Sequence, residues 1–382
     1  MTEWRKVKLG DCCEITSSKR IFYNEYVESG VPFYRSKEII EKAKGDTIST
    51  PLFISHARFK EIQESFGAPQ KRDLLLTAVG SLGIPYLIND SNPFYFKDGN
   101  LIWFKSFNGD LNSEFLYYWF KTRSAFQMLD KIAIGSAQKA LTISSIKQIS
   151  IEIPARDIQD RIVTVLSRYD ALIENYQRQI KLLEEATQRL YKEWFVDLRF
   201  PGHQSTPIIN NLPQGWQKKR ITDILDIKYG KDHKKLKDGP IPVYGTGGIM
   251  RYADSCLYCG ESVLIPRKGS LNNIMLVNGS FWTIDTMFYS IPKIENAAKI
   301  AYFYLKDLDM YSFNIGAAVP SMTINILSGM EISLPTDEIR HEFECTVDNY
   351  YQQIALLENQ IRTLSEARDR LLPKLISGEI EV

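Results

Sequence analysis

The cysteines and histidines of this 382-residue chain belong to the residue types that most often bind metals or carry nucleophilic catalysis, but their spacing fits neither role. Cys256 and Cys259 form a lone Cys-x-x-Cys pair with no second pair nearby, whereas a structural zinc ion needs about four ligands. The histidines are scattered without metal or triad spacing: His56, His203, His233 and His341. We therefore expect surface histidines, reduced thiols and no metal site.

The sequence also lacks complete motifs for nucleotide binding, methyl transfer or nuclease chemistry. The segment GTGGIM at 245–250 lacks the GxGxxG spacing, and no GxxxxGK[ST] loop occurs in the sequence. The segment SNPFY at 91–95 lacks the second proline of the Asn-Pro-Pro-aromatic motif of adenine methyltransferases. The Glu-x-Lys of many metal-dependent restriction nucleases does not occur either. We expect no catalytic residue and no cofactor in this chain.

Basic, hydroxyl and amide side chains instead gather in loops between short strands, in a pattern that suits double-stranded DNA. Lysines crowd residues 218–237 and can replace counterions on phosphates, while Arg267, Lys268 and an asparagine at 272 or 273 can reach base edges. A solvated loop and ordinary hairpin turns explain these residues about as well. The DNA-contacting candidates are Arg35, Ser36, Lys37, Ser81, Gln138, Lys139, Lys231, Lys234, Lys235, Tyr244, Thr246, Arg267, Lys268, Ser270 and Asn272.

The chain also repeats itself nearly from end to end. WRKVKLGDCCEI from Trp4 matches WQKKRITDILDI from Trp216, and GSAQKALTISSIKQISIEIP from Gly135 matches GAAVPSMTINILSGMEISLP from Gly316. The offset falls from about 212 to 181 between these pairs, so the second copy is shorter by about thirty residues. Two related globular domains are expected, each with an α+β (mixed α/β) fold.

A long helix follows each globular domain, and the two helices are the most similar parts of the repeat. QIKLLEEATQRL at 179–190 returns as QIRTLSEARDRL at 360–371. Apolar residues recur at steps of three and four, which predicts an antiparallel coiled coil that relates the domains by a pseudo-twofold axis. The alternative is that each helix packs on its own domain. The expected seam is Ile158, Ile162, Leu166, Tyr169, Ile173, Tyr176, Ile180, Leu183, Ile339, Phe343, Val347, Tyr350, Ile354, Leu357, Ile361 and Leu364.

Prolines and glycines mark the boundaries. Pro154 and Pro335 precede the helices, and a proline- and glycine-rich linker follows the first one, while the second is expected to break or kink near Pro373. The predicted segments are a first domain at 1–153, a central helix at 154–200, a linker at 201–215, a second domain at 216–335 and a C-terminal helix at 336–382.

The charge distribution is weakly consistent with a nucleic-acid partner. The net charge is +1, but residues 1–154 and 216–335 each carry three more basic than acidic residues, and residues 336–382 carry five more acidic than basic ones. The chain has neither an apolar leader nor a stretch of about 18 apolar residues, so we expect a cytoplasmic protein without membrane contact.

Taken together, these segments resemble the specificity subunit of type I restriction-modification enzymes. The resemblance rests on LPQGW followed by ITDIL, on the run from YGTGGIM to TIDTMFY, and on the helix ends QIKLLEEATQRLYKEWF and QIRTLSEARDRLLPKLISGE. It implies two target recognition domains that each read half of a bipartite DNA site. It also implies two modification subunits that use S-adenosylmethionine, and motor and nuclease subunits that use ATP and Mg²⁺.

Two other classes of function stay open at this point. The chain could be a scaffold that binds only proteins, or a stand-alone DNA methyltransferase or nuclease. Specific DNA retention by the assembled complex argues against the first, and a lack of activity in the purified chain argues against the second.

Overall fold

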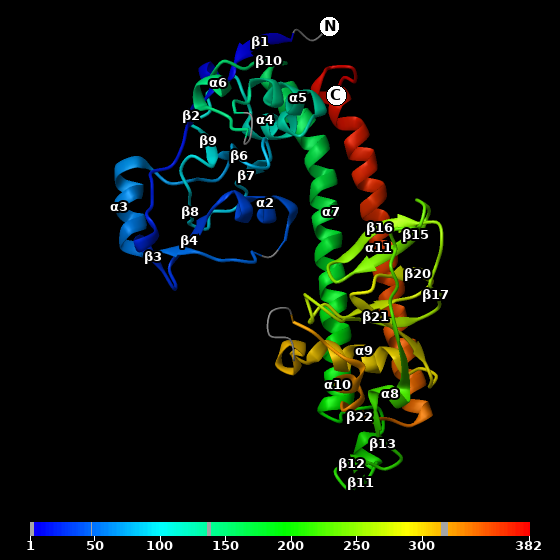
Figure 1. Ribbon diagram of the computed structural model, residues 1–382. Coiled ribbons are helices and arrows are strands. Elements are labelled where there is room, and N and C mark those ends of the chain that lie inside the picture. The colour runs from blue at the N-terminus through cyan, green and yellow to red at the C-terminus, as the bar shows by residue number, and fades with distance from the viewer. Residues whose placement is uncertain (1–3, 47, 136–138, 315–319) are drawn as a thin grey trace. The chain divides into compact units, whose positions relative to one another are not determined.

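The computed structural model describes residues 4–46, 48–135, 139–314 and 320–382 (Figure 1). The chain divides into two compact units, one made of Met1–Arg178 with Glu358–Val382 and the other of Gln179–Leu357. Each unit therefore contains one globular domain and parts of both long helices.

The first unit contains two four-stranded sheets and one two-stranded pair. One sheet is antiparallel in the order β2 (Glu14–Thr16), β9 (Leu101–Lys105), β6 (Leu74–Thr77), β7 (Pro85–Leu87). The other has the order β3 (Tyr26–Val27), β5 (Phe53–Ile54), β4 (Val31–Tyr34), β8 (Tyr95–Phe96), in which β4 and β8 run parallel. The pair is β1 (Arg5–Lys8) with β10 (Ser150–Ile153).

The second unit repeats the antiparallel sheet and the two-stranded pair, and its second sheet again contains one parallel strand pair, although the strand order of that sheet differs. Its antiparallel sheet has the order β14 (Leu225–Tyr229), β21 (Met287–Pro292), β18 (Ser262–Pro266), β19 (Met275–Val277). Its second sheet has the order β16 (Gly248–Ala253), β15 (Ile241–Gly245), β20 (Ser280–Thr283), β17 (Tyr258–Cys259), with β15 and β20 parallel. The pair β13 (Gln217–Arg220) with β22 (Glu331–Leu334) corresponds to β1 with β10.

Short helices complete the two domains. The first contains α1 (Leu9–Cys12), η1 (Tyr23–Glu25), α2 (Ser36–Lys44), α3 (His56–Phe66), α4 (Ser113–Phe120), α5 (Arg123–Ile132) and α6 (Ile143–Lys147). The second unit contains α8 (Ile221–Ile224), α9 (Ala298–Asp307), η4 (Met310–Phe313) and α10 (Ile324–Ser328), and its linker forms η3 (His203–Ser205) and a hairpin of β11 (Ile208–Ile209) and β12 (Leu212–Pro213).

The repeated sequence before each long helix also repeats its local structure. The Thr142 hydroxyl accepts a hydrogen bond from the Ser145 amide at 3.1 Å and caps α6, and the Thr323 hydroxyl accepts one from the Ile326 amide at 3.3 Å and caps α10. Threonine at this position satisfies an amide that has no partner within the helix. The repeat of Thr-Ile therefore preserves a helix start in both copies.

Most of the missing length of the second copy lies between two strands. In the first domain 39 residues separate the end of β4 from the start of β6, and they form α2, β5 and α3. In the second domain 16 residues separate the end of β15 from the start of β18, and they form β16 and β17. The domains thus share a framework and differ in what connects its strands.

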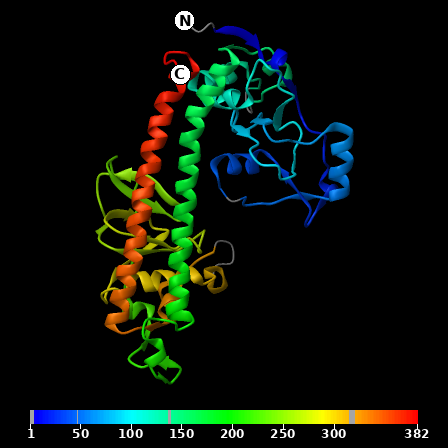
Figure 2. The ribbon, with the colours of Figure 1, turned by 180° about the vertical axis from the view of Figure 1, so that it is seen from behind.

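The long helices are α7 (Arg156–Tyr191), which continues into a π-helical turn η2 (Lys192–Val196), and α11 (Asp337–Ile376). In the first unit, the start of α7 packs with the end of α11 and the globular core: Ile158, Ile162 and Leu166 share one cluster with Leu372, Leu375 and Ile376. In the second unit, Tyr191, Trp194 and Phe195 share a cluster with Phe343 and Val347. The helices therefore run antiparallel within each unit, side by side in both views (Figures 1 and 2).

Every expected seam residue is buried or half-buried, but the ends of the seam differ from the simple coiled coil. Ile158, Ile162, Leu166, Phe343 and Val347 belong to cores that also contain the globular domain, because the end turns of each helix face both partners. The half-buried positions are Tyr169, Tyr176, Ile180, Leu183, Ile339, Tyr350, Leu357, Ile361 and Leu364, while Ile173 and Ile354 are buried.

Of the break or kink expected near Pro373, the break is wrong, and the kink stays a prediction. Helix α11 continues through Pro373 to Ile376, and the Ser377 amide donates to the Pro373 carbonyl at 3.0 Å. Leu375 and Ile376 are buried in the first core. This packing holds the last turn in spite of the missing amide of proline.

Candidate nucleic-acid interface

Each domain has a parallel strand pair whose carboxyl ends lie at the same edge of its second sheet. In the first domain Phe33 pairs with Tyr95 and Tyr34 with Phe96, so the residues that follow, Arg35 and Lys97, leave the sheet together. Loops at the carboxyl ends of parallel strands commonly form ligand sites. We therefore compare the two domains at this edge.

The edge of the first domain carries a pocket of about 660 Å³. It is lined by side chains from the loop after β2 and by residues that follow β4 and β8, among them Arg20, Tyr23, Arg35 and Asp98. Arg20 donates through Nε to Asp98 Oδ2 at 2.9 Å, with the arginine largely exposed. The pocket thus combines aromatic rings with a paired charge that faces solvent.

Arg35 is placed at this edge, but its guanidinium is already engaged. It donates to the buried Glu38 carboxylate at 2.5 and 3.1 Å and to Thr50 Oγ1 at 3.1 Å, while its amide caps α2 by donating to Glu38. Burial raises the pKa of Glu38, but the hydrogen bonds from the side chain and amide of Arg35 bring it below its ordinary value. Arg35 is therefore first a structural residue, and only the exposed part of its side chain is open to DNA.

The other candidates of the first domain occupy more than one place. Ser36 donates to the Asn100 carbonyl at 3.2 Å, and Lys37 is exposed near Thr50 and Glu41 at the same edge. Ser81 is exposed in the turn after β6, and Lys139 is paired with Asp130 at 2.5 Å. Gln138 lies outside the described residues.

The corresponding edge of the second domain brings together loops that are far apart in sequence. Val243 pairs with Trp282 and Tyr244 with Thr283, so Thr246 follows one strand closely and Asp285 the other. The Asn273 amide donates to the Thr246 carbonyl at 2.7 Å, which joins the loop after β15 to the loop after β18. Tyr244 and Thr246 are half-buried.

Arg267 follows β18 of the antiparallel sheet and reaches this edge. Its guanidinium carbon is 5.3 Å from the ring centroid of Tyr229, and Nη1 donates to the Asp285 carbonyl at 3.2 Å. A stacked arginine that keeps free donors can meet a phosphate or a guanine edge. Lys268 and Ser270 follow it and are exposed.

Asn272 has a structural role that its sequence position does not reveal. Its Oδ1 accepts from the Met310 amide at 2.8 Å, and its Nδ2 donates to Asp309 Oδ1 at 3.2 Å. Both ends of the amide are therefore used to hold η4, where Tyr311 donates to the Gly269 carbonyl. Asn272 could contact an adenine only if it first gave up these hydrogen bonds to Met310 and Asp309.

The lysine-rich loop after β14 lies beside the same edge. The Lys231 amide donates to the Thr283 carbonyl at 2.9 Å, and Trp282 Nε1 donates to the Lys231 carbonyl at 2.9 Å. Lys231, Lys234 and Lys235 are exposed. The loop is thus anchored by its backbone, with its ammonium groups in solvent.

Two aromatic residues of the first domain were not among the expected contacts. Phe22 and Tyr23 are 59% and 89% exposed, and Tyr23 lines the pocket of the first domain. At the offset of 212, Tyr23 corresponds to Lys235, so an aromatic loop replaces the lysine loop. The two basic residues followed closely by three aromatic residues in KRIFYNEY were the signal that could have identified them.

Other chemistry-bearing residues lie elsewhere. Cys256 and Cys259 are exposed, and within the described ranges no three or more His, Cys, Asp or Glu side chains form a group that could hold a metal ion. His56 and His341 are exposed as expected, whereas His203 and His233 are half-buried.

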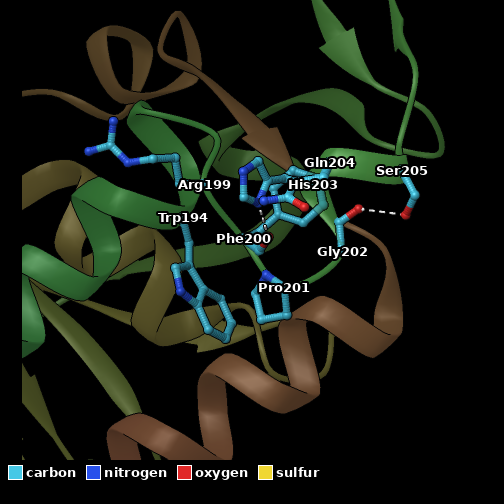
Figure 3. A pocket seen from close by; sticks show the side chains of 8 residues that line it. All are labelled: Trp194, Arg199, Phe200, Pro201, Gly202, His203, Gln204 and Ser205. Atoms are coloured by element: carbon cyan, nitrogen blue, oxygen red, sulfur yellow. Dashed lines mark hydrogen bonds between the residues drawn. The ribbon is translucent and has the colours of Figure 1, made fainter.

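A second pocket, of about 570 Å³, lies on the linker (Figure 3). It is lined by Trp194 and residues 199–205, and the His203 ring contacts the Phe200 carbonyl at 2.9 Å. Arg199, also in its lining, is held by Glu193 at 2.5 Å. This pocket follows the packing of one continuous segment, so we do not assign the DNA contacts to it.

The comparisons with known proteins cover both domains. The sequence profile of the type I restriction modification DNA specificity domain matches residues 1–185 and 213–366. The chain belongs to this family. Its two domains are accordingly target recognition domains of a type I restriction-modification specificity subunit, and they serve in DNA sequence recognition.

Individual relatives agree over the whole length. The chain is 27% identical to the type I restriction enzyme MjaIX specificity subunit of Methanocaldococcus jannaschii, over all of this chain and 94% of that one. It is 20% identical to the type I restriction enzyme HindI specificity subunit of Haemophilus influenzae, over the full length of both. The crystal structure of an S subunit from M. genitalium shares the fold, with a TM-score of 0.58 at 17% identity over 98% of this chain and 96% of that one.

None of the helices in the described part of the specificity subunit has the length and apolar character needed to cross a membrane.

Proposed function

We propose that this specificity subunit reads a bipartite double-stranded DNA target, one half-site per recognition domain, and that α7 and α11 set the distance between the half-sites. One observation carries the proposal. Both domains carry a parallel strand pair whose carboxyl ends form one edge, but Arg20, Tyr23 and Asp98 lie there in one copy, whereas Arg267 and Asp285 lie there in the other, with the lysine-rich loop beside them. A shared framework with different loop residues suits two readers of different sequences.

The subunit acts as a non-catalytic scaffold in this proposal. The long helices are the most similar parts of the repeat, as expected if both perform one shared task, such as holding two copies of a modification subunit. Adenine methylation with S-adenosylmethionine, and cleavage with ATP and Mg²⁺, then belong to the modification subunits and the motor and nuclease subunits. With double-stranded DNA as its partner, the proposed place of action is the cytoplasm.

The charged groups at the edge of the first domain support a binding role rather than acid–base catalysis. Asp98 is paired with Arg20, and Glu38 is paired with Arg35. Paired carboxylates of this kind orient loops and give the surface its charge pattern.

Sequencing of methylated adenines tests the proposal directly. The subunit is expressed with its modification subunits in a strain that lacks adenine methylation, and modified positions are mapped across the genome. We expect one motif with two defined parts and a fixed spacer. Methylation without such a motif contradicts bipartite reading, and methylation by the purified subunit alone supports the rival of a stand-alone enzyme. If the assembled complex retains all DNA duplexes equally, the protein-only scaffold is favoured.

A further inference from the structure

A buried lysine joins the second recognition domain to helix α11. The Lys299 side chain is only 6% exposed and lies in the first turn of α9. Its Nζ is 2.8 Å from Glu261 Oε1 and 2.9 Å from Asp348 Oδ1, and it also contacts Glu344 Oε1. All four residues belong to the second unit.

The geometry of this cluster fixes both the distance and the relative orientation of the elements that carry its four side chains. An ammonium group has three N–H donors, and here three carboxylates surround it, so each donor has a partner. Glu344 and Asp348 are one turn apart on α11, whereas Glu261 directly precedes β18. The lysine therefore links three elements at one point.

The charge of Lys299 supports this link, although burial raises the pKa of the Glu344 carboxyl. Burial lowers the pKa of Lys299, but hydrogen bonds to Glu261 and Glu344 outweigh it and raise the pKa above its ordinary value. Lys299 therefore stays protonated at neutral pH. A buried ammonium with carboxylate partners is hard to separate from them, because each freed charge would remain desolvated.

Strand β18 connects this link to the DNA edge. It runs from the residue after Glu261 to the residue before Arg267, and six residue steps of extended chain span about 20 Å. Hydrogen bonds between Val263 and Ser290 and between Ser290 and Ser262, at 2.9 and 3.0 Å, join the start of the strand to β21. A rotation of about 10° at the lysine would move the Arg267 loop by about 3.5 Å, close to the rise of one base pair.

The apolar contacts between the domain and α11 do not set this angle as sharply. Phe343 and Val347 belong to the core of the second unit, and apolar burial is non-directional. Hydrogen-bonded charges impose both distance and angle.

We infer that Lys299 is a positioning residue that holds the second recognition domain at one angle to α11 and thereby limits the spacer length that the subunit accepts. This inference rests on the proposed bipartite reading. It concerns how strictly the spacer is measured, and leaves the bases read by each domain unchanged.

The test compares methylation maps of the assembled methyltransferase with wild-type subunit and with Lys299→Met, which keeps the chain length and removes the charge. We expect the variant to methylate the wild-type half-sites at spacers one base pair longer or shorter, with at least a tenfold rise in the fraction of such sites. Simple destabilisation would instead lower methylation at every site without new spacers, and this outcome would overturn the inference.

Two further variants make the result decisive. Lys306→Met removes a lysine of the same helix that donates to Tyr302 at 2.8 Å instead of to the acidic cluster, and it should leave the spacer unchanged. Glu261→Gln removes one of the three ion pairs at a partly exposed position, and we expect about a threefold rise in off-spacer sites. If Glu261→Gln keeps the wild-type spacer, the inference is wrong even where Lys299→Met fails to assemble. A wild-type map without any bipartite motif would instead contradict the proposed function.

Discussion

The lysine loop of the second domain gives the most direct measure of DNA contact. We consider the double substitution Lys234→Ala with Lys235→Ala in the assembled enzyme. Within the part of the chain that the structure describes, neither ammonium has an ion pair or a hydrogen bond, and both side chains are exposed. The substitution therefore removes two charges without breaking a contact that stabilises the fold.

The expected magnitude follows from counterion release. Each phosphate contact contributes about −0.9 to the slope of log K against log salt concentration, so two contacts contribute about −1.8. The variant should bind about thirtyfold more weakly at 0.15 M salt. Raising salt from 50 to 200 mM should weaken the wild type about twelvefold more than the variant.

The assay is DNA binding by fluorescence anisotropy at several salt concentrations, with one duplex that carries the mapped target and one that does not. The loss should be similar for both duplexes, because phosphate contacts carry no base information. Lys228→Ala is the matched control, since that ammonium is already paired with Asp226 at 2.8 Å and should change the slope less. An unchanged slope in the double variant would refute the reasoning and remove both lysines from the interface.

Three further predictions follow from the same structure. Tyr23→Ala should weaken binding of the mapped target at least tenfold while leaving the thermal unfolding midpoint within about 2 °C, because the ring is almost fully exposed; equal weakening on an unrelated duplex would argue against a specific contact. Insertion of one heptad after Leu183 and another after Leu364 lengthens each helix by about 10 Å. The spacer between the methylated half-sites should grow by about three base pairs, with both half-sites retained. A methylation map with the original spacer would contradict the proposal that the helices set this distance. The pKa of Glu38 is lowered in the folded protein, so the stability that its pairing with Arg35 provides is present above the unfolded pKa and is lost as pH falls through the folded pKa. The difference in unfolding midpoint between wild type and Glu38→Gln should therefore shrink below about pH 4.5. A constant difference down to about pH 3 would contradict the pairing.

Local patterns in the sequence were enough to predict the architecture. The repeat around Trp4 and Trp216 predicted two related domains, and the family comparison and the mixed α/β fold agree with that prediction. Helix periodicity depends on neighbours three or four positions apart, so the long helices were also visible in the sequence. The exception was Pro373, where packing of Leu375 and Ile376 extends the helix beyond a residue that disfavours it.

Sequence alone gave less about the individual side chains of the interface. It identified loops with suitable chemistry, but it did not show that Arg35 is bound to Glu38 or that Asn272 holds the backbone of Met310. Likewise, Tyr23 could be matched with Lys235 by the repeat, yet its exposure became evident only in the folded domain. The DNA contacts of all these residues remain predictions.

The sequence by itself determined the duplication, the helices and the kinds of residue available for DNA contact, because each is written in short-range spacing. Only the tertiary structure decided which of those side chains are free and which are engaged. Glu261, Lys299 and Glu344 show the reason: they are far apart in the chain, and meet because strand β18, helix α9 and helix α11 pack together. A charge that is solvated in an unfolded segment becomes a fixed link only when burial removes its water.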